Sequence, residues 1–308
     1  MCFLSYQATM KDNDILVIDL FSGPGGLGEG FASYIDNNKH PFKIGMSVEK
    51  DPHAHMTLTT RAFYRLAKQK GCLDSYYQYL NGKISRNNLF ESHEEIYGSA
   101  FQETLEGPCE LGIDNDHIHA RVKELTENHS GPKILIGGPP CQAYSLAGRS
   151  RNAGNKNYVP KEDHRHFLYK EYLQVLSIAK PDVFVMENVK GILSSTHGGS
   201  RIFDQIIDDL ANPGNGLHYE IRSFVAGENG PPETHKGYVI ESEKFGIPQM
   251  RHRVILFGIR KDFSPHRHRL LKVSADNSNS VSNALAGLPK LRSRLSKEVD
   301  SHESWLSA

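Results

Sequence analysis

The sequence predicts an α/β protein with a doubly wound, mostly parallel sheet and helices on both faces. Short apolar runs rich in β-branched residues alternate with segments of helical periodicity through residues 14–263, as in folds whose parallel strands are joined by helices. The runs are continuously apolar, which is typical of strands buried on both faces. Chemically distinctive residues follow the ends of these runs, where ligands bind in such folds.

Five strands and five helices are expected along the chain. The strands are expected at residues 14–21, 42–49, 133–138, 182–188 and 252–259. The helices are expected at residues 26–35, 51–70, 116–125, 165–179 and 201–210. Pro52 supports the start of the second helix, because proline fits the first turn, where a helix leaves its N–H groups unpaired.

Two regions fall outside this alternation. Residues 70–112 are expected to form a mainly helical and acidic insertion, because residues 91–116 carry eight acidic side chains and no lysine or arginine. Residues 264–308 are polar and contain one weak helical pattern. We therefore expect one domain over residues 1–263 and a tail over residues 264–308.

The composition argues against several classes of protein. The chain has no apolar stretch approaching the ~18–20 residues that cross a bilayer, and its N-terminus lacks the pattern of a signal peptide. Its four cysteines contain no C-x-x-C pair, and its 16 histidines are scattered. We therefore expect a cytoplasmic protein without a membrane segment, a disulfide framework or a metal site.

Charge is unevenly distributed although the formal net charge is zero. Residues 244–272 carry eight basic side chains against Asp262 alone, whereas residues 91–116 are acidic. Two solvated faces explain this distribution, and so does one face that binds an anionic polymer. Composition alone leaves both interpretations open.

The turn after the first strand reads DLFSGPGGLGEGF and indicates a cofactor site. Gly23, Gly25 and Gly28 form the pattern G-x-G-x-x-G, and Glu49 follows about twenty residues later, as in a turn that binds NAD or FAD. The same stretch carries Phe21, which a dinucleotide turn does not require. The turn alone therefore leaves the cofactor open.

Potentially reactive side chains lie at later strand ends. Cys141 lies in GGPPCQAYS, where prolines and glycines fix the backbone ahead of the thiol. A lone cysteine often only fills space, but these polar surroundings favour a nucleophile. Glu187 ends the strand at 182–188, which suits either an acid–base group or a turn cap. Arg251 and Arg253 lie two apart as the last strand begins and are expected to share a face, where they suit carbonyl or phosphate oxygens.

Together, the motifs DLFSGPGG, PPCQAYS, ENVKG and QMRHRV resemble those of the DNA (cytosine-5) methyltransferases. They occur in the family's order over residues 14–262. The resemblance implies a Rossmann-like class I methyltransferase fold and transfer of a methyl group from S-adenosylmethionine to carbon 5 of cytosine in DNA. It further implies a duplex substrate whose target base is flipped out of the stack, in the setting of restriction–modification or regulation.

The resemblance assigns catalytic roles to particular residues. Cys141 would add to carbon 6 of cytosine, so that carbon 5 can attack the methyl group. Glu187 would bind ring N3 and the exocyclic amine, and Arg253 would hold O2 with support from Arg251. Asn188 would brace the loop that carries the cysteine. The substrate-binding residues that the resemblance implies are Pro140, Gln142, Ser145 and Gln249.

The resemblance also implies a cofactor site. Phe21 would lie against the adenine, Glu49 would accept from the ribose hydroxyls, and the glycines would let the backbone approach the methionine portion. The family carries a second acidic residue near the adenine amine, and Asp114 is expected there, with Asp116 as the alternative. The cofactor-binding residues expected on this basis are Phe21, Ser22, Gly23, Gly25, Gly26, Glu49, Asp114 and Leu168.

Three alternatives stay open. The PCQ and ENV motifs are shared with a branch that methylates RNA. An NAD- or FAD-dependent oxidoreductase explains the glycine pattern and leaves Cys141, Glu187 and Arg253 without a task. An inactive or partner-dependent chain is the third alternative, because the family's target-recognition region and its last two motifs have no counterpart after Ser264. A truncated product, an N-terminal piece and one subunit of a split enzyme each fit this pattern.

We expect the purified 308-residue chain to methylate DNA poorly or not at all. In the family, the region that has no counterpart here makes many of the base and phosphate contacts that position a duplex. Transfer of a radiolabelled methyl group to duplex DNA measures the activity. Robust sequence-specific methylation by the chain alone would contradict this expectation.

Overall fold

The computed structural model describes residues 14–140, 168–197, 200–228, 230–263, 268–274, 280–288, 295 and 299–307. These residues divide into two compact units. The first contains the described residues of Met1–Ile240 and His252–Leu271, and the second those of Glu241–Arg251 and Lys272–Ala308.

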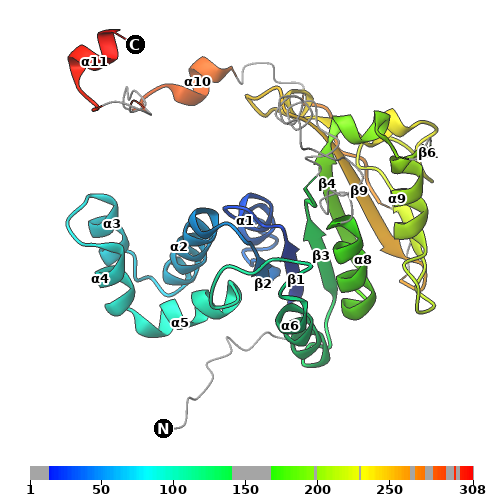
Figure 1. Cartoon of the computed structure of the whole chain (residues 1–308), viewed down its shortest axis with the longest axis horizontal. Helices are drawn as coiled ribbons and strands as arrows, with labels where there is room; N and C mark the ends of the chain where they lie inside the picture. The colour runs from blue at the N-terminus through cyan, green and yellow to red at the C-terminus, as the bar shows by residue number, and fades with distance from the viewer. Residues whose placement is uncertain are drawn as a thin grey trace, which may run out of the picture. The chain divides into compact units, whose positions relative to one another are not determined.

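The first unit is built on a seven-stranded sheet with the order β2-β1-β3-β4-β9-β7, and β8 pairs with β9 (Figure 1). Its strands are β1 (Ile15–Leu20), β2 (Phe42–Val48), β3 (Lys133–Gly137), β4 (Val183–Val189), β7 (Tyr219–Arg222), β8 (Val239–Glu241) and β9 (His252–Arg260). The first four strands are parallel to one another, whereas β9 runs antiparallel to β4 and β7. The expected mostly parallel α/β sheet is confirmed.

Helices pack against both faces of this sheet, because alternate residues of each strand point to opposite sides. Ile18 and Leu20 of β1 belong to a core shared with helices α6, α8 and α9. Val17, which precedes Ile18, packs with Ala32 of helix α1 on the other face. These helices are α1 (Gly26–Ser33), α6 (Asn115–Glu127), α8 (Leu168–Ala179) and α9 (Ile202–Ala211).

The segment expected as an insertion forms three short helices beside α2 (Pro52–Gln69). They are α3 (Asp74–Leu80), α4 (Arg86–Glu91) and α5 (Glu94–Glu103). They share a separate apolar core with α2 around Phe63, Leu89 and Ala100, all of which are fully buried. The insertion and α2 therefore form an apolar core separate from the cores on the two faces of the sheet.

The remaining short elements connect the strands or lie in the second unit. In the first unit these are η3 (Lys190–Ser194), β5 (Thr196–His197), β6 (Ser200–Arg201) and η4 (His235–Tyr238). In the second unit they are η5 (Ser242–Phe245), α10 (Val281–Leu285) and α11 (His302–Ser307). The sequence did not predict β7 or β8, because each is short and carries polar residues that interrupt an apolar run.

A bidentate ion pair joins the insertion to helix α2. The Arg65 guanidinium donates from Nη2 to Glu103 Oε1 at 2.6 Å and from Nη1 to Glu103 Oε2 at 3.1 Å. Its Nε also reaches Glu29 of α1 at 3.3 Å. Because Glu103 is buried, its charge depends on this partner.

We expect Arg65→Met to destabilise the chain by about 3–5 kcal/mol, because it leaves the Glu103 carboxylate buried and unpaired. The double variant Arg65→Met with Glu103→Gln is expected to recover most of this loss. Denaturant unfolding of the parent chain, both single variants and the double variant measures the coupling. A cost below about 1 kcal/mol for Arg65→Met would match an exposed pair and contradict the prediction.

Candidate functional site

The turn after β1 is held by the ends of two strands. Phe21 and Gly23 adopt left-handed backbone angles, with φ of 56° and 55°. The Ser22 N–H donates to the Val48 carbonyl at 3.0 Å. Gly25 has a φ of 89° and precedes α1, and a Cβ there would lie 2.8 Å from Leu58 Cδ1. Both its conformation and its surroundings therefore require glycine.

This turn lies where the sheet reverses its winding. The chain passes from β1 outward to β2 and later to β3 on the other side of β1. Such a switch point is where doubly wound folds bind their ligands, beyond the carboxyl ends of the strands.

The Glu49 carboxylate ties the turn to the start of α2. Oε2 accepts from the Gly23 N–H at 2.8 Å and Oε1 from the Asp51 N–H at 2.7 Å. Asp51 in turn caps α2 by accepting from the N–H groups of His53 and Ala54. A carboxylate has about four acceptor positions, so Glu49 is fixed in place and keeps two positions for a ligand.

A cavity of about 200 Å³ opens beside this turn. It is lined by Phe21, Val48, Glu49, Lys50, Cys109, Glu110, Leu111, Gly138, Pro140 and Leu168. Phe21, Glu49 and Leu168, which the sequence predicts as cofactor residues, therefore share one cavity. The other predicted cofactor residues of the turn do not line the cavity and instead form the turn that carries Phe21; they are Ser22, Gly23, Gly25 and Gly26. Pro140, predicted at the substrate, lines the same cavity.

The sequence did not point to Lys50, Cys109 or Glu110, which form a wall of this cavity. The Cys109 N–H donates to the Glu49 carbonyl at 2.9 Å, and Lys50 Nζ lies 2.7 Å from Glu110 Oε1. Only the order of the elements could have indicated this wall. Helix α6 leads into the parallel strand β3, so the chain that returns from the insertion passes the carboxyl end of β2 before α6 starts.

Asp114 has a different place from the one that the sequence predicts. It does not line the cavity, and its Oδ2 accepts from the Glu110 N–H at 2.7 Å at the start of α6. Asp116 lies in the first turn of that helix. The acidic side chains at the cavity wall are therefore Glu49 and Glu110, and Asp114 fixes the backbone of Glu110.

Glu187 and Arg253 meet because of the register between β4 and β9. Arg253 lies opposite Val189, so its side chain shares a face with Glu187, two residues earlier on β4. Arg253 Nε lies 2.8 Å from Glu187 Oε1, and about a quarter of each side chain is exposed. A Cβ on Gly138 would lie 3.2 Å from Glu187 Oε2. Since Gly138 also lines the cavity, the ion pair lies beside it.

Asn188 holds the backbone that precedes the expected nucleophile. Its Nδ2 donates to the Pro139 carbonyl at 3.2 Å, and its Oδ1 accepts from the Val189 N–H at 2.9 Å. Residues 139 and 140 are thereby tied to the end of β4. Cys141, Gln142 and Ser145, which the sequence predicts at the site, lie outside the described residues.

Arg251 and Gln249 belong to the second unit. Strand β9 begins at His252, so Arg251 precedes the strand that positions Arg253. The Arg251 carbonyl accepts from the N–H of Ser242 at 3.2 Å and from its hydroxyl at 2.7 Å. Gln249 lines a pocket of about 470 Å³ in that unit, together with Lys244 and Met250. Arg253 belongs to the first unit and pairs there with Glu187, and the role of Arg251 stays a prediction.

Two further observations concern the described ranges only. Within them, no three or more His, Cys, Asp or Glu side chains are grouped so that they could hold a metal ion. No described helix is both long enough and apolar enough to cross a membrane.

The cavity, with two acidic side chains in its wall, lies at the switch point where α/β proteins with a doubly wound sheet bind their ligands. Comparison with known proteins narrows this class. The sequence pattern described as C-5 cytosine-specific DNA methylase matches residues 101–306. The chain belongs to this family, which confirms the resemblance that its motifs predict.

Curated relatives agree with this assignment. The chain is 34% identical over 300 residues to type II methyltransferase M.Bpa9945I of Bacillus paralicheniformis. This match covers 90% of this chain and 61% of the relative. It is 27% identical over 267 residues to M.BsuRI of Bacillus subtilis, covering 84% and 46%. It is 33% identical over 244 residues to M.AquIA of Picosynechococcus, covering 79% and 71%. The chain thus spans about half the length of the first two relatives.

Family membership contradicts the oxidoreductase interpretation of the glycine pattern. The third glycine of that pattern, Gly28, has a structural reason of its own. A Cβ at Gly28 would lie 2.7 Å from Asp19 Oδ2, so glycine allows helix α1 to pack on the end of β1.

Asp19 lies buried beneath the cofactor turn. Asp19 is 1% exposed, and this burial raises the pKa of its carboxyl to about 8. The unfolded chain has an ordinary carboxyl at this position, with a pKa near 3.8. Unfolding therefore releases a proton at pH values between these two.

We expect Asp19→Asn to remove this pH dependence. The stability of the parent chain relative to the variant is expected to fall as the pH rises from about 4 to about 8, and to level off above about 8. The slope within this window is at most about 1.4 kcal/mol per pH unit. Denaturant unfolding of both proteins across this range measures it. A difference in stability that does not change with pH would contradict the prediction.

Proposed function

We propose that this chain carries the chemistry of a DNA (cytosine-5) methyltransferase, with S-adenosylmethionine as the methyl donor and a flipped cytosine as the acceptor. The observation that carries the proposal is the ion pair between Glu187 and Arg253 beside the cavity. It combines an acidic group and a guanidinium, which complement the N3, amine and O2 edge of cytosine, at the wall of a cofactor site.

The residues of the cavity suit the adenosine part of this cofactor. Phe21, Val48 and Leu168 supply apolar surface for a purine ring. Glu49 keeps acceptor positions for the two ribose hydroxyls, and Glu110 supplies an acceptor for the exocyclic amine. When bound, S-adenosylmethionine supplies an electrophilic methyl group.

The base is held by side chains at the end of β4 and the start of β9. Glu187 binds the exocyclic amine and shares a proton with ring N3. Arg253 donates to O2 through Nη2, because its Nε binds Glu187 and its Nη1 donates to the His252 carbonyl at 2.8 Å. These contacts read the pairing edge, which is accessible only when the base leaves the duplex.

Cys141 supplies the nucleophile in this proposal. Its thiolate would form a bond to carbon 6 and make carbon 5 nucleophilic. Carbon 5 could then take the methyl group as the bond from that group to the donor sulfur breaks, which leaves S-adenosylhomocysteine. Loss of the proton on carbon 5 then breaks the bond from sulfur to carbon 6 and restores the ring. Asn188 holds Pro139, so it fixes the backbone two residues before the thiol.

Covalent trapping tests the proposal. Turnover by the chain alone is expected to be poor, but a covalent trap needs only one turnover. We therefore expect the chain, with S-adenosylmethionine, to form a denaturation-stable adduct on duplex DNA containing 5-fluorocytosine, because fluorine at carbon 5 prevents the elimination step. Cys141→Ser should abolish the adduct and Glu187→Gln should reduce it by about tenfold or more. Cys72→Ser, which changes a cysteine outside the site, is the matched control and should form the adduct normally.

The same assay separates the alternatives. An adduct on single-stranded RNA and none on duplex DNA would favour the branch that acts on RNA. An adduct that persists in Cys141→Ser would exclude that residue as the nucleophile. The inactive alternative predicts no adduct together with normal binding of the demethylated cofactor, measured by calorimetry.

A further inference from the structure

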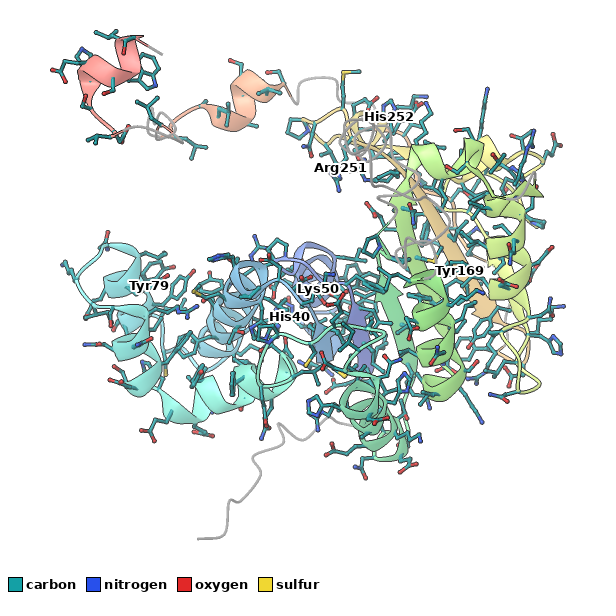
Figure 2. The ribbon with its side chains drawn as sticks, in the orientation of Figure 1. His40, Lys50, Tyr79, Tyr169, Arg251 and His252 are labelled. Carbon is teal, nitrogen blue, oxygen red and sulfur yellow. The ribbon has the colours of Figure 1, made fainter. Side chains whose placement is uncertain are left out.

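An ion pair crosses the wall of the cofactor cavity. Lys50 lies two residues after β2, and Glu110 lies in the segment that returns from the helical insertion. Lys50 Nζ lies 2.7 Å from Glu110 Oε1, and both residues line the cavity. Figure 2 shows Lys50 just beyond the end of β2.

The backbone around Glu110 is fixed on both sides. The Glu110 N–H donates to Asp114 Oδ2 at 2.7 Å, and its carbonyl accepts from the N–H groups of Ile113 and Asp114 at 3.0 and 2.9 Å. The preceding Cys109 N–H donates to the Glu49 carbonyl at 2.9 Å. With its backbone held in this way, the Glu110 side chain is the part that can still rotate, and Lys50 restrains it.

The pair leaves one carboxylate oxygen available. Among the described residues, Lys50 is the side chain that binds the Glu110 carboxylate, and it does so at Oε1. Oε2 therefore stays open to a ligand in the cavity. An ionised carboxylate only accepts hydrogen bonds. The Glu110 carboxylate can therefore accept a hydrogen bond from the amine at position 6 of adenine. The carbonyl oxygen that hypoxanthine carries at that position is also an acceptor and is repelled by the carboxylate.

We propose that Lys50 is a positioning residue that sets the base specificity of the cofactor site. It holds the Glu110 carboxylate so that the cavity selects a nucleoside with an exocyclic amine over its 6-oxo counterpart. This inference rests on the proposed function, because it concerns the same cofactor. The alternative is that Lys50 and Glu110 form a surface ion pair without a role in binding. Their side chains are 54% and 35% exposed, and exposed ion pairs contribute little to stability.

Calorimetric titration with two ligands tests the proposal. The ligands are S-adenosyl-L-homocysteine and S-inosyl-L-homocysteine, which differ in the group at position 6 of the purine and in the proton that the 6-oxo ring carries on N1. We expect the parent chain to prefer the adenosyl ligand by about tenfold or more, as one charge-assisted hydrogen bond provides. Lys50→Met should reduce this ratio several-fold, mainly by weakening the adenosyl ligand, and Lys50→Arg should preserve most of it.

Two further variants sharpen the interpretation. Glu110→Gln should abolish or reverse the preference, because an amide can also donate to the 6-oxo group. Lys39→Met changes another exposed lysine, outside the cavity, and should leave both affinities unchanged. Thermal unfolding of each variant checks that it is folded. Glu110→Gln keeps the test decisive if Lys50→Met is unstable.

Each outcome decides the question. An unchanged ratio in Lys50→Met, or an equal loss for both ligands, would overturn the positioning role and leave the proposed function intact. An unchanged ratio in Glu110→Gln would exclude Glu110 as the acceptor and would overturn the inference as well. A parent chain that binds neither ligand would instead overturn the proposed cofactor.

Discussion

The carboxylate of Glu49 is the constraint on which the proposed cofactor site depends. It accepts from the N–H of Gly23 in the turn after β1 and from the N–H of Asp51 at the cap of α2. One side chain thereby fixes both the turn that carries Phe21 and the first turn of the helix that leads into the insertion. The carbonyl of the same residue accepts from the Cys109 N–H, which places the cavity wall that Cys109 and Glu110 form. A change at Glu49 would therefore affect the geometry of the cavity as well as its contacts to a ligand.

A second constraint comes from strand register. The antiparallel pairing of β9 with β4 sets Arg253 opposite Val189 and so brings its guanidinium to Glu187. A shift of one residue would turn Arg253 to the other face of the sheet. The proposed site for the base thus depends on the backbone hydrogen bonds of a buried strand pair, which hold charged groups in place more firmly than a surface loop can.

The sequence predicted the parts of the fold that follow from local pattern. Continuous apolar runs located β1, β2, β3, β4 and β9, because strands covered on both faces carry few polar residues. The edge strand β7 was missed because its four residues include Glu220 and Arg222. Phe21, Glu49 and Leu168 were predicted as one cofactor site, and the structure places them around one cavity.

The residues that sequence reasoning missed depend on contacts between distant segments. Glu110 reaches the cavity because the insertion returns to the end of β2, and no local pattern encodes that return. Asp114 has the charge that the prediction sought, but the start of α6 engages its carboxylate with the Glu110 N–H. Arg251 and Arg253 were expected on one strand face, but β9 begins between them at His252. The roles of Cys141, Gln142 and Ser145 stay predictions from sequence.

The hydrogen bond between the Cys109 N–H and the Glu49 carbonyl joins the two ends of the segment that contains α2 and the helical insertion. The chain leaves the sheet and returns to it at neighbouring points, so residues 50–108 form a loop whose ends are already joined. The length and composition of helices α3 to α5 can then diverge among related proteins without displacing the cofactor wall, provided that α2 keeps its apolar face covered. A fold arranged in this way can acquire or exchange a peripheral module while the geometry of its catalytic edge is inherited unchanged.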